Sequence, residues 1–506
     1  MSFLPSSDTF RLGDTWHCSD GKRVHAFYLK LLLDGSQKPG PNAGGIGHAV
    51  SEDLIHWEEL PDAVEPGGAG GYDDLDIWTG CTVYTQGKFY LFYTSRSSEG
   101  PEFSFSLAIS EDGIRFKKFD GNPLFTPDEK IYFGVNRRCR LRMHGNGYPG
   151  ALQYDLRDLC VQRENPQSPW YGFFAARIPA DEIPKTAVIG LAVSQDLLHW
   201  EQRPPCFAPD RYHVIETPDV FQMNGKWYML CLTGNVYGQR HCVSDSSPYD
   251  RATIYAVADR IDGPYRETEN NALLVTKTAS GACAKTVLHN GQRYMFYTEV
   301  LEDPIGHYEQ YMSLPKPLAA DGDGTLRLKW YPLIERLYTN EALPLIQSAQ
   351  IVNDGRFGTP GKWEHRDNAV YGSCETDWCI LPFAHEIKDF AAEAVIERQT
   401  AESAGFAFDL GDSVFGGGYQ VILDYKYNKV ILATARTFGI LDERDYPLQD
   451  RQHALKVLVT GNTVEIYLND DLVLHHLLRR NGGHFAFYLE KGQVAFSSAK
   501  LHAVEI

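Results

Sequence analysis

The sequence of 506 residues is poor in basic side chains, with 48 Lys and Arg against 66 Asp and Glu and a formal net charge of -18. Such a charge repels a phosphate backbone, so we do not expect a nucleic acid partner. Long apolar runs are lacking as well, because no stretch approaches the roughly 18 to 20 continuous apolar residues of a membrane-spanning helix. A membrane is therefore not an expected partner either.

Two further signals are missing. The opening residues, MSFLPSSDTFRLGD, have neither the basic start nor the apolar run of a secretory leader, which predicts a cytoplasmic protein. The ten cysteines are scattered without the paired Cys-x-x-Cys spacing of a zinc site. We therefore expect reduced, structural thiols and no metal site.

Aromatic residues are abundant, with 26 Phe, 28 Tyr and 9 Trp, and they recur in a pattern. Five times within the first 300 residues, a glycine or polar turn is followed by an aromatic-rich strand segment. These segments are GKRVHAFYLKL from Gly21, GKFYLFYTS from Gly87, SPWYGFFAAR from Ser168, GKWYMLCLTG from Gly225 and GQRYMFYTEV from Gly291. Internal repeats of this kind indicate a modular architecture.

The repeats are roughly 55 to 80 residues long, which is enough for four short strands and their turns. Five four-stranded units that close into a ring form a five-bladed β-propeller, which is the predicted fold. A β-sandwich of similar length is the alternative, because strand counting does not distinguish a ring from a stack.

The pattern changes from about Tyr331, where a partly helical connector leads into alternating strands joined by Gly-Asn, Asn-Asp and Lys-Gly turns. This region predicts a separate β-sandwich. The expected organisation is all-β, with a five-bladed propeller over residues 1–335, a linker over 336–355 and a β-sandwich over 356–506. The sandwich offers no acid cluster, and we expect it to support the propeller or to mediate contacts in a homo-oligomer.

Three of the repeats carry an acidic residue just before the aromatic strand: Asp14, Asp158 and Glu216. Corresponding strands of a propeller line its central channel, so the three acids are expected to meet at one opening. Glycoside hydrolysis uses two carboxyl groups, one ionised and one protonated, on opposite sides of the scissile bond. The pattern therefore predicts a glycosidase site.

The neighbours of the acids indicate different roles. Arg157 is adjacent to Asp158 and is expected to keep that carboxylate ionised, which suits binding of sugar hydroxyls. Glu216 has no adjacent cation and lies between Ile215 and Pro218, which suits a proton donor.

Further candidates have an ordinary structural interpretation beside the functional one. Trp16 and Trp78 are candidates for stacking on sugar rings or for packing between blades. His17, His48 and Asp76 are candidates for the pocket rim or for structural hydrogen bonds. The repeated Ser-x-Asp-x-x-x-Trp pattern at Ser51 and Ser194 predicts a structural corner, with the tryptophan packed between blades.

Several stretches resemble glycoside hydrolase family 32, which includes invertases, inulinases and levanases. GHAVSEDLIHWEELPDAVEPG at residues 47–67 is the longest of them, and DIWTGCTVY from Asp76 looks like the family's Trp-Ser-Gly strand. Arg157-Asp158 is similar to the family's Arg-Asp-Pro motif, and ETPD at 216–219 is similar to its Glu-Cys-Pro-Asp motif.

The resemblance implies a five-bladed propeller with a C-terminal sandwich, an oligosaccharide substrate and no cofactor. It implies Asp14 as nucleophile, Glu216 as general acid and base, and Asp158 with Arg157 as the pair that holds sugar hydroxyls, in a reaction that retains anomeric configuration. Gly13 and Leu29 depart from the family's asparagine and glutamine and remove hydrogen-bond donors. The resemblance thus implies a fructofuranosidase-like hydrolase or a fructosyltransferase, and an unusual fructo-oligosaccharide or a difructose anhydride is a candidate substrate.

Two other functions are compatible with the residues. One is an inverting propeller glycosidase of the arabinan or xylan type, which also uses three acids. The other is a sugar-binding propeller without catalytic activity, which the altered residues around Asp14 would favour.

Overall fold

The computed structural model describes residues 9–33, 39–101, 103–134, 139–140, 152–153, 156–179, 187–212, 214–234, 251–276, 281–302, 308–339, 361–375, 377–411, 417–435 and 439–505. It contains two compact units, Ser2–Arg327 and Leu328–Ile506, with Met1 assigned to the second. The predicted boundaries at 335 and 355 stay predictions, because residues 340–360 lie outside the described part. None of the described helices has the length and apolar character that crossing a membrane requires.

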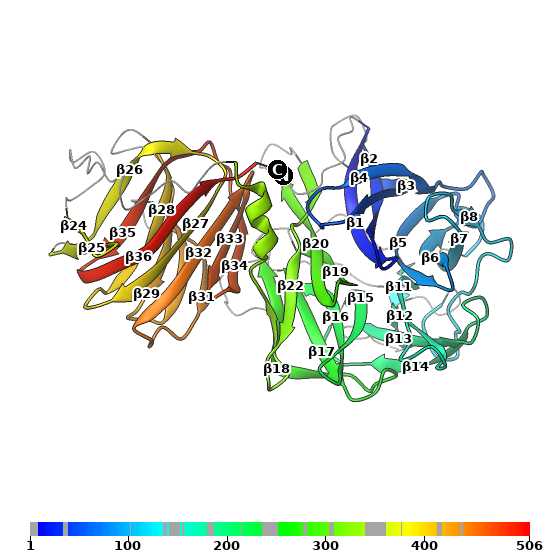
Figure 1. The fold of residues 1–506 in the computed structure, drawn as a ribbon. Coiled ribbons are helices and arrows are strands. Elements are labelled where there is room, and N and C mark those ends of the chain that lie inside the picture. Colours follow the sequence, from blue (N-terminus) through cyan, green and yellow to red (C-terminus); the bar gives the residue numbers. More distant parts are fainter. Residues whose placement is uncertain are drawn as a thin grey trace. The chain divides into compact units, whose positions relative to one another are not determined.

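The unit Ser2–Arg327 is a five-bladed β-propeller whose blades follow one another around a ring in chain order (Figure 1). Blades 1 and 2 consist of β1 (Phe10–Ser19), β2 (Val24–Leu33), β3 (Pro39–Ser51) and β4 (Glu58–Val64), and of β5 (Asp76–Thr85), β6 (Lys88–Arg96), β7 (Ser104–Ser110) and β8 (Lys117–Lys118). Blades 3 and 4 consist of β11 (Leu156–Gln162), β12 (Trp170–Arg177), β13 (Ala187–Ser194) and β14 (Glu201–Phe207), and of β15 (Glu216–Met223), β16 (Lys226–Gly234), β17 (Arg251–Ala258) and β18 (Arg266–Thr276). Blade 5 consists of β19 (Ala282–His289), β20 (Gln292–Glu302), β22 (Lys316–Ala320) and β23 (Leu326–Leu328), with β21 (Tyr308–Met312) beside β20. A two-stranded ribbon, β9 (Cys139–Arg140) with β10 (Leu152–Gln153), precedes blade 3.

The five aromatic segments of the sequence are the second strands of the five blades, β2, β6, β12, β16 and β20. Each pairs antiparallel with the first and the third strand of its own blade, and β20 of blade 5 pairs with β21 as well. A central strand is covered on both faces, so nearly every side chain of β12 and β20 for which burial is described is buried or half-buried. Aromatic and β-branched side chains fill such positions well.

Hydrogen bonds between neighbouring first strands connect the blades into a ring. The Trp16 indole of blade 1 donates to Thr82 of blade 2 at 3.1 Å. At the other end of the unit, the Cys283 thiol of blade 5 donates to the carbonyl of Thr15 in blade 1 at 3.5 Å. The first and last blades are thus adjacent, which confirms the propeller and rules out the alternative of a β-sandwich for this unit.

The Ser-x-Asp-x-x-x-Trp repeats form identical corners after the third strands of blades 1 and 3. The Ser51 and Ser194 hydroxyls accept hydrogen bonds from backbone N–H groups three residues ahead, at 2.8 and 2.9 Å. Trp57 packs against Phe296 of blade 5. The tryptophan of the second corner packs against blade 2 in the same way. The predicted structural interpretation of this repeat is confirmed.

The unit Leu328–Ile506 is a β-sandwich. One sheet has the order β24 (Lys362–Arg366), β25 (Ala369–Cys374), β36 (Gly492–Ala503), β27 (Phe390–Arg398), β32 (Gln452–Thr460), β33 (Thr463–Leu468) and β34 (Asp471–Leu477). The other has the order β26 (Cys379–Ile387), β35 (Gly483–Glu490), β28 (Ser403–Leu410), β29 (Tyr419–Asp424), β30 (Lys429–Thr434) and β31 (Ile440–Asp445).

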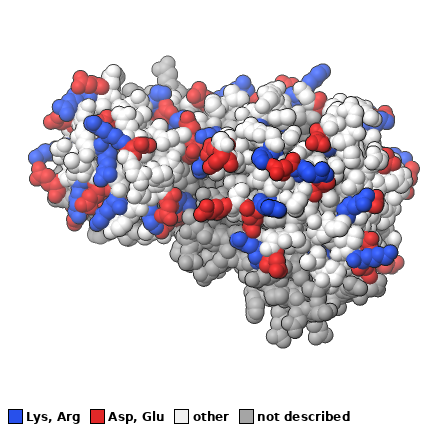
Figure 2. Space-filling model, turned by 90° about the horizontal axis from the view of Figure 1, so that it is seen from below, with Lys and Arg blue, Asp and Glu red and all other residues white. Residues whose placement is uncertain are grey.

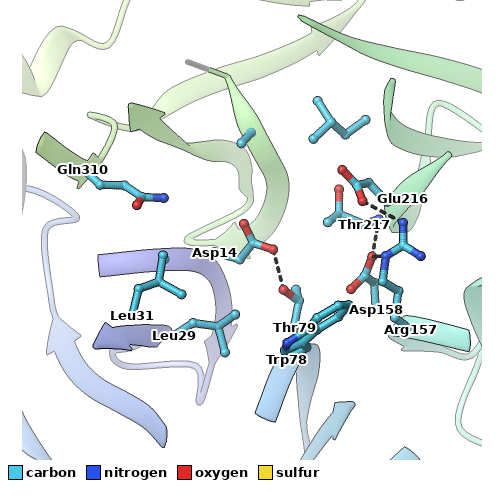
Figure 3. A pocket seen from close by; sticks show the side chains of 13 residues that line it. Asp14, Leu29, Leu31, Trp78, Thr79, Arg157, Asp158, Glu216, Thr217 and Gln310 are labelled. Carbon is cyan, nitrogen blue, oxygen red and sulfur yellow. Dashed lines mark hydrogen bonds and ion pairs between the residues drawn. The ribbon is translucent and has the colours of Figure 1, made fainter. Parts of the chain in front are cut away.

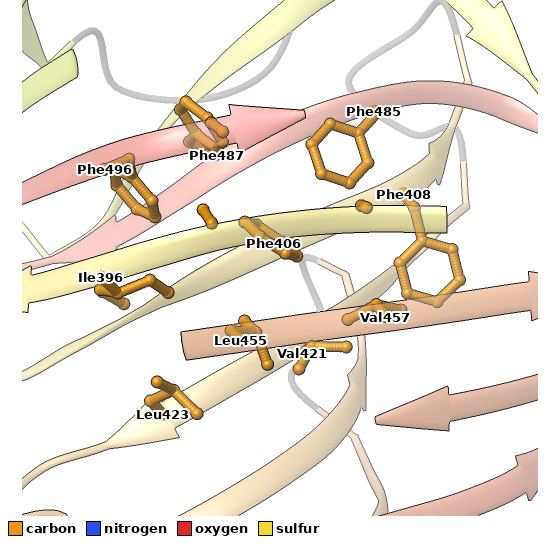
Figure 4. Close-up of a cluster of buried hydrophobic side chains, with 14 of the residues drawn as sticks. Ile396, Phe406, Phe408, Val421, Leu423, Leu455, Val457, Phe485, Phe487 and Phe496 are labelled. Atoms are coloured by element: carbon orange, nitrogen blue, oxygen red, sulfur yellow. The ribbon is translucent and has the colours of Figure 1, made fainter. Parts of the chain in front are cut away.

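The core of the sandwich lies between these two sheets (Figure 4). Phe487 of β35 stacks on Phe496 of β36 with ring centroids 4.3 Å apart, and Phe406 lies beside them. Burying an aromatic or branched side chain of this size contributes roughly 1.5 to 3 kcal/mol. The predicted Gly-Asn, Asn-Asp and Lys-Gly turns join β32 to β33, β33 to β34 and β35 to β36. Of the expected helical connector, the described part is a 3-10 helix over Pro332–Leu337.

Acidic and basic side chains are interspersed on the face shown in Figure 2 rather than gathered by sign. Among the described residues, acidic and basic side chains also pair at close range, for example Lys30 with Asp62 at 2.6 Å. Exposed pairs of this kind stabilise a fold only slightly. The eight cysteines that the structure describes are free thiols, and all of them except Cys81 are buried, as expected for structural thiols.

Candidate active site

The first strand of every blade has a shift in its pairing register at the same place along the ring. In β11 the shift lies between Arg157 and Cys160, and in β15 it lies between Glu216 and Asp219. Equivalent shifts occur in β1, β5 and β19. Such β-bulges bend a strand and redirect its side chains. The candidate acids all lie at these bulges, although Asp158 lies inside its bulge while Glu216 immediately precedes its own.

The bulges place ordinary residues in the left-handed backbone region. Asp158 has φ of 62° and Thr217 has φ of 52°. Non-glycine residues rarely adopt this conformation, which costs on the order of 1 to 3 kcal/mol and persists only where the surroundings enforce it. The enforcing contact for Thr217 comes from Asp158, whose Oδ2 accepts the Thr217 N–H at 3.0 Å. The two bulges therefore stabilise each other across the boundary between blades 3 and 4.

A pocket of about 310 Å³ opens where these strands meet (Figure 3). Its lining residues are Gly13, Asp14, Leu29, Leu31, Trp78, Thr79, Arg157, Asp158, Glu216, Thr217, Leu232, Ala282 and Gln310. The structure thus brings together the three predicted acids, which are separated in sequence by up to two hundred positions, with Arg157 and Trp78.

Asp14 is held by a hydrogen bond from the neighbouring blade. The Thr79 hydroxyl of β5 donates to Asp14 Oδ2 in a short contact. The backbone carbonyl of Thr79 in turn accepts from the Thr94 hydroxyl at 2.9 Å, and Thr94 Oγ1 accepts the Asp158 N–H at 3.0 Å. Asp14 and Asp158 are therefore connected through buried threonines of blade 2. A carboxylate fixed in this way is oriented before any reaction.

Arg157 connects the other two acids. Its Nη2 lies 2.8 Å from Glu216 Oε2, and its Nε lies 3.5 Å from Asp158 Oδ2. The expectation that Glu216 has no cationic neighbour is therefore wrong, because adjacency in sequence does not reveal a contact between blades. The guanidinium occupies the space beside both carboxylates, so a metal cation coordinated by this pair would face a positive charge.

Burial raises the pKa of Asp158 to about 7, and the nearby negative charges of Glu216 and Asp14 act in the same direction. The Arg157 guanidinium and the Thr217 N–H oppose this rise. The sequence led us to expect that Arg157 keeps Asp158 ionised. That expectation is corrected, because desolvation of a side chain that is only 3% exposed outweighs the effect of the guanidinium.

One wall of the pocket is apolar. Leu29 and Leu31 of β2 face Asp14 in Figure 3. A Cβ atom at Gly13 would lie 2.9 Å from Leu29 Cβ and 3.0 Å from Leu31 Cγ, which is too close for an ordinary contact. The two departures from the family pattern, glycine at 13 and leucine at 29, are therefore coupled, since the leucines fill the space that a larger residue at 13 would need.

Trp78 lines the pocket and is fixed from behind. Its indole N–H donates to Asp76 at 2.5 Å, and the Arg96 guanidinium lies over its ring at 4.7 Å. Asp76 is fully buried and does not line the pocket. The structure thus places Asp76 behind the pocket, where it orients Trp78.

Three other candidates lie away from the pocket. Trp16 packs between blades 1 and 2, stacked on Phe27. His17 stacks on Phe296 of blade 5 at 4.2 Å, and burial lowers its pKa to about 3. His48 is fully buried, and its Nε2 lies 2.9 Å from His25 Nδ1. Of the two interpretations given for these residues, the structure supports the structural one, since each of the three contributes to packing inside or between blades.

Three polar residues of the pocket were missed by the sequence analysis. Thr79 holds Asp14, Thr217 follows Glu216 with its hydroxyl buried, and Gln310 of β21 lies at the far side of Asp14. Thr79 follows Trp78 in a motif that had been singled out, so that signal was present. Gln310 lies in no motif, and the sequence alone contains no signal for it.

Comparison with known proteins relates part of this chain to a family. Residues 25–137 match the model of the glycosyl hydrolases family 32 N-terminal domain. The vacuolar acid β-fructofuranosidase 4 of Arabidopsis thaliana is 30% identical over 130 residues, which are 24% of this chain and 16% of that protein. The levanase of Bacillus sp. (strain L7) is 24% identical over 521 residues, which cover 92% of this chain and 49% of that protein. The chain spans about half or less of the length of these relatives.

Solved structures share the fold along nearly the whole chain. A family 32 β-fructofuranosidase of Bombyx mori has a TM-score of 0.68 at 18% identity, covering 99% of this chain and 93% of that one. The exo-inulinase of Aspergillus awamori has a TM-score of 0.68 at 15% identity, covering 100% and 98%. These likenesses confirm the predicted propeller and sandwich, and the match of residues 25–137 to the family model confirms the predicted resemblance to glycoside hydrolase family 32.

Proposed function

We propose that this protein is a retaining glycosidase that acts on β-fructofuranosides. The observation that carries the proposal is the convergence of Asp14, Asp158 and Glu216, from three different blades, on one pocket. The match to the family 32 model and the names of the relatives, which are fructofuranosidases and a levanase, support the choice of a fructoside.

In the proposed first step, an oxygen of ionised Asp14 attacks the anomeric carbon of the fructosyl unit. The bond from that carbon to the leaving oxygen breaks, and its electron pair takes the proton of the Glu216 carboxyl group. This yields a fructosyl ester of Asp14 and releases the leaving sugar. In the second step, Glu216 accepts a proton from water, whose oxygen attacks the anomeric carbon and releases Asp14. Each attack inverts the configuration, so the overall reaction retains it.

Asp158 and Arg157 bind and orient the substrate in this proposal. The carboxyl group of Asp158 faces the pocket beside Asp14, where it can hold sugar hydroxyls. Arg157 contacts both Glu216 and Asp158, so it sets the positions of the proton donor and the binding carboxylate together. Fixing groups in the reactive geometry before the reaction is a large part of catalysis.

The finer assignment of substrate is also part of the proposal. The leucine wall beside Asp14 offers no hydrogen bond to a sugar hydroxyl, so we propose a fructo-oligosaccharide or a difructose anhydride in preference to sucrose. A location in the cytoplasm, association of several copies and activity without a metal or organic cofactor stay predictions.

The experiment that tests the reaction follows its stereochemistry. The purified protein is incubated with a β-linked fructo-oligosaccharide in aqueous methanol, and the methyl fructofuranoside is identified by NMR. Retention gives the methyl β-anomer, which does not interconvert with the α-anomer in water as free fructose does. The α-anomer alone would indicate the inverting arabinan or xylan type of propeller glycosidase.

The absence of turnover has a separate meaning. If no fructoside, arabinoside or xyloside is cleaved and binding of sugar is still measurable by calorimetry, the protein is a sugar-binding propeller. Glu216→Gln provides the control, because it preserves the shape of the side chain and removes the transferable proton. We expect it to lower kcat by roughly 10² to 10⁴-fold on a substrate with a poor leaving group.

A further inference from the structure

Gln310 is a buried polar residue in the pocket that the proposed mechanism does not use. It lies in β21, opposite Val300 of β20, and is only 5% exposed. Its Oε1 atom is buried and has no hydrogen-bond partner among the residues that the structure describes. A buried amide oxygen that lacks a partner among the described residues is unfavourable, and the hydroxyl of a bound ligand would satisfy it.

The side chain of Gln310 is directed into the pocket. Figure 3 shows its amide end pointing toward Asp14, on the side of Asp14 that is opposite to Glu216. The sugar hydroxyls held by Asp158 and Arg157 lie at the other end of the pocket in the proposed mechanism. Gln310 is therefore in a position to contact a part of the substrate that those two residues do not reach.

The residues around Gln310 restrict which chemical group of the substrate can bind beside it. Leu29 and Leu31 form the adjacent wall, and Gly13 beneath them presents no side chain. A group bound here meets apolar carbon on one side and a single amide on the other. A group with one hydroxyl and one methylene satisfies both, whereas two neighbouring ring hydroxyls would leave one of them against leucine without a partner.

We propose that Gln310 is a specificity-determining residue that binds the hydroxyl of a hydroxymethyl arm of the furanoside, while the methylene of that arm packs on Leu29 and Leu31. This inference rests on the proposed function, because β-fructofuranose carries two such arms, at C1 and C6. The Gln310 carbonyl accepts the hydrogen bond of the arm's hydroxyl. The amide thereby selects a substrate that bears the arm over one that lacks the hydroxyl.

The test compares one variant on matched substrates. Gln310→Leu removes the amide and keeps a similar volume, and the substrates are p-nitrophenyl β-D-fructofuranoside and its 1-deoxy and 6-deoxy analogues. We expect the variant to lower kcat/KM for the parent substrate by roughly 10 to 100-fold, since a polar contact in a buried site is lost. For one of the two deoxy analogues, kcat/KM is expected to change by less than about threefold, because that analogue has no hydroxyl for Gln310 to bind.

Two controls separate binding from folding. Gln222→Leu, at an exposed position of β15, is expected to leave all three substrates unchanged. Gln310→Met repeats the loss of the amide with a more flexible side chain, so that one poorly folded variant does not decide the result. Thermal unfolding of each variant verifies that the propeller is intact.

A failure of this inference can be distinguished from a failure of the proposed function. If the unchanged protein cleaves the parent substrate but both Gln310 variants lose the same factor on all three substrates, Gln310 has a merely structural role and this inference is wrong. If the variants lose nothing on the parent substrate, it is wrong as well. If the unchanged protein cleaves none of the three fructosides and no fructo-oligosaccharide or difructose anhydride either, the proposed function itself has failed.

Discussion

The bulges of β11 and β19 have the same backbone form and different uses. Each shifts the register of its strand, and each places one residue in the left-handed region, Asp158 with φ of 62° and Cys283 with φ of 50°. Each is also bonded to the next blade around the ring, through the Thr217 N–H in one case and the Thr15 carbonyl in the other. Asp158 lines the pocket, whereas Cys283 is fully buried and does not.

The difference shows that the bulge has a structural role in the ring at every blade and a role in the pocket only at some of them. All five first strands have it, because the bend lets neighbouring blades form hydrogen bonds near the axis. The proposed chemistry arises at those bulges where a side chain in the bulge or directly before it is acidic. A propeller of this type therefore provides five similar positions around one opening, and the residue types decide which of them react.

The largest expected effect separates a chemical bulge from a structural one. Asp14→Asn in the bulge of β1 removes the proposed nucleophile and should lower kcat/KM on a fructofuranoside by about 10⁴-fold. Cys283→Ser in the bulge of β19 should change it by less than about threefold. Initial rates, with circular dichroism to verify folding, give the comparison. Comparable losses in the two variants would contradict the distinction between a catalytic bulge in β1 and a structural bulge in β19.

The next effect concerns the bulge of β11. Asp158→Asn keeps the volume of the side chain and its bond to Thr217, and removes its negative charge. We expect a loss of roughly 10² to 10³-fold in kcat/KM, because a carboxylate binds sugar hydroxyls more strongly than an amide does in a site without water. The loss should appear mainly in kcat if the contact strengthens in the transition state. A variant with full activity would show that Asp158, like Cys283, has a structural role and does not contribute to substrate binding.

The titration of Asp158 gives an intermediate effect. Its pKa is raised to about 7, so the carboxyl group is mostly protonated at pH 6 and mostly ionised at pH 8. Ionised oxygens accept hydrogen bonds from sugar hydroxyls, and kcat/KM should therefore rise by up to about tenfold across this interval. A pH-rate profile measures it, and the residual activity of Asp158→Asn serves as control because it should lack this limb. A profile that falls between pH 6 and 7 would reverse the assignment of the active form.

The smallest effect tests how the bulge of β11 is held. Thr94→Val removes the hydroxyl that accepts the Asp158 N–H and donates to the Thr79 carbonyl. Two buried backbone groups then lose their partner, which should lower the free energy of unfolding by roughly 1 to 3 kcal/mol and lower kcat several-fold. Denaturant unfolding measures the change in the free energy of unfolding, and initial rates measure the change in kcat. Thr253→Val in blade 4 is the matched control, because the Thr253 hydroxyl donates a long hydrogen bond of 3.5 Å to the carbonyl of Gly281.

Local patterns predicted much of this molecule from the sequence. The aromatic segments from Gly21 and Gly291 are second strands of blades because alternation and turn chemistry act within a few residues. The corner at Ser51 was interpreted correctly for the same reason, since its hydrogen bonds join residues three positions apart. Asp14 and Glu216 were found because each directly precedes such a local signal.

Contacts between blades were not predictable in this way. Arg157 is adjacent to Asp158 in sequence, yet its shorter contact is with Glu216, because the first strands of blades 3 and 4 are side by side. Trp16 and His17 follow Asp14 in a strand and were candidates either for the pocket or for packing. Asp14 and Trp16 would share a face in a regular strand, but Asp14 lies at the bulge between Leu12 and Thr15. Trp16 and His17 pack into the walls of the blade.

The sequence by itself determined the repeated strands, the corners, the separate sandwich and the identity of the three acids, because periodicity and turn preference depend on near neighbours along the chain. Tertiary structure alone decided which side chains share the pocket, how Arg157 divides its contacts, and that Asp158 has a raised pKa. Those properties depend on distance and on exclusion of water, and both arise only when the ring has closed around its axis.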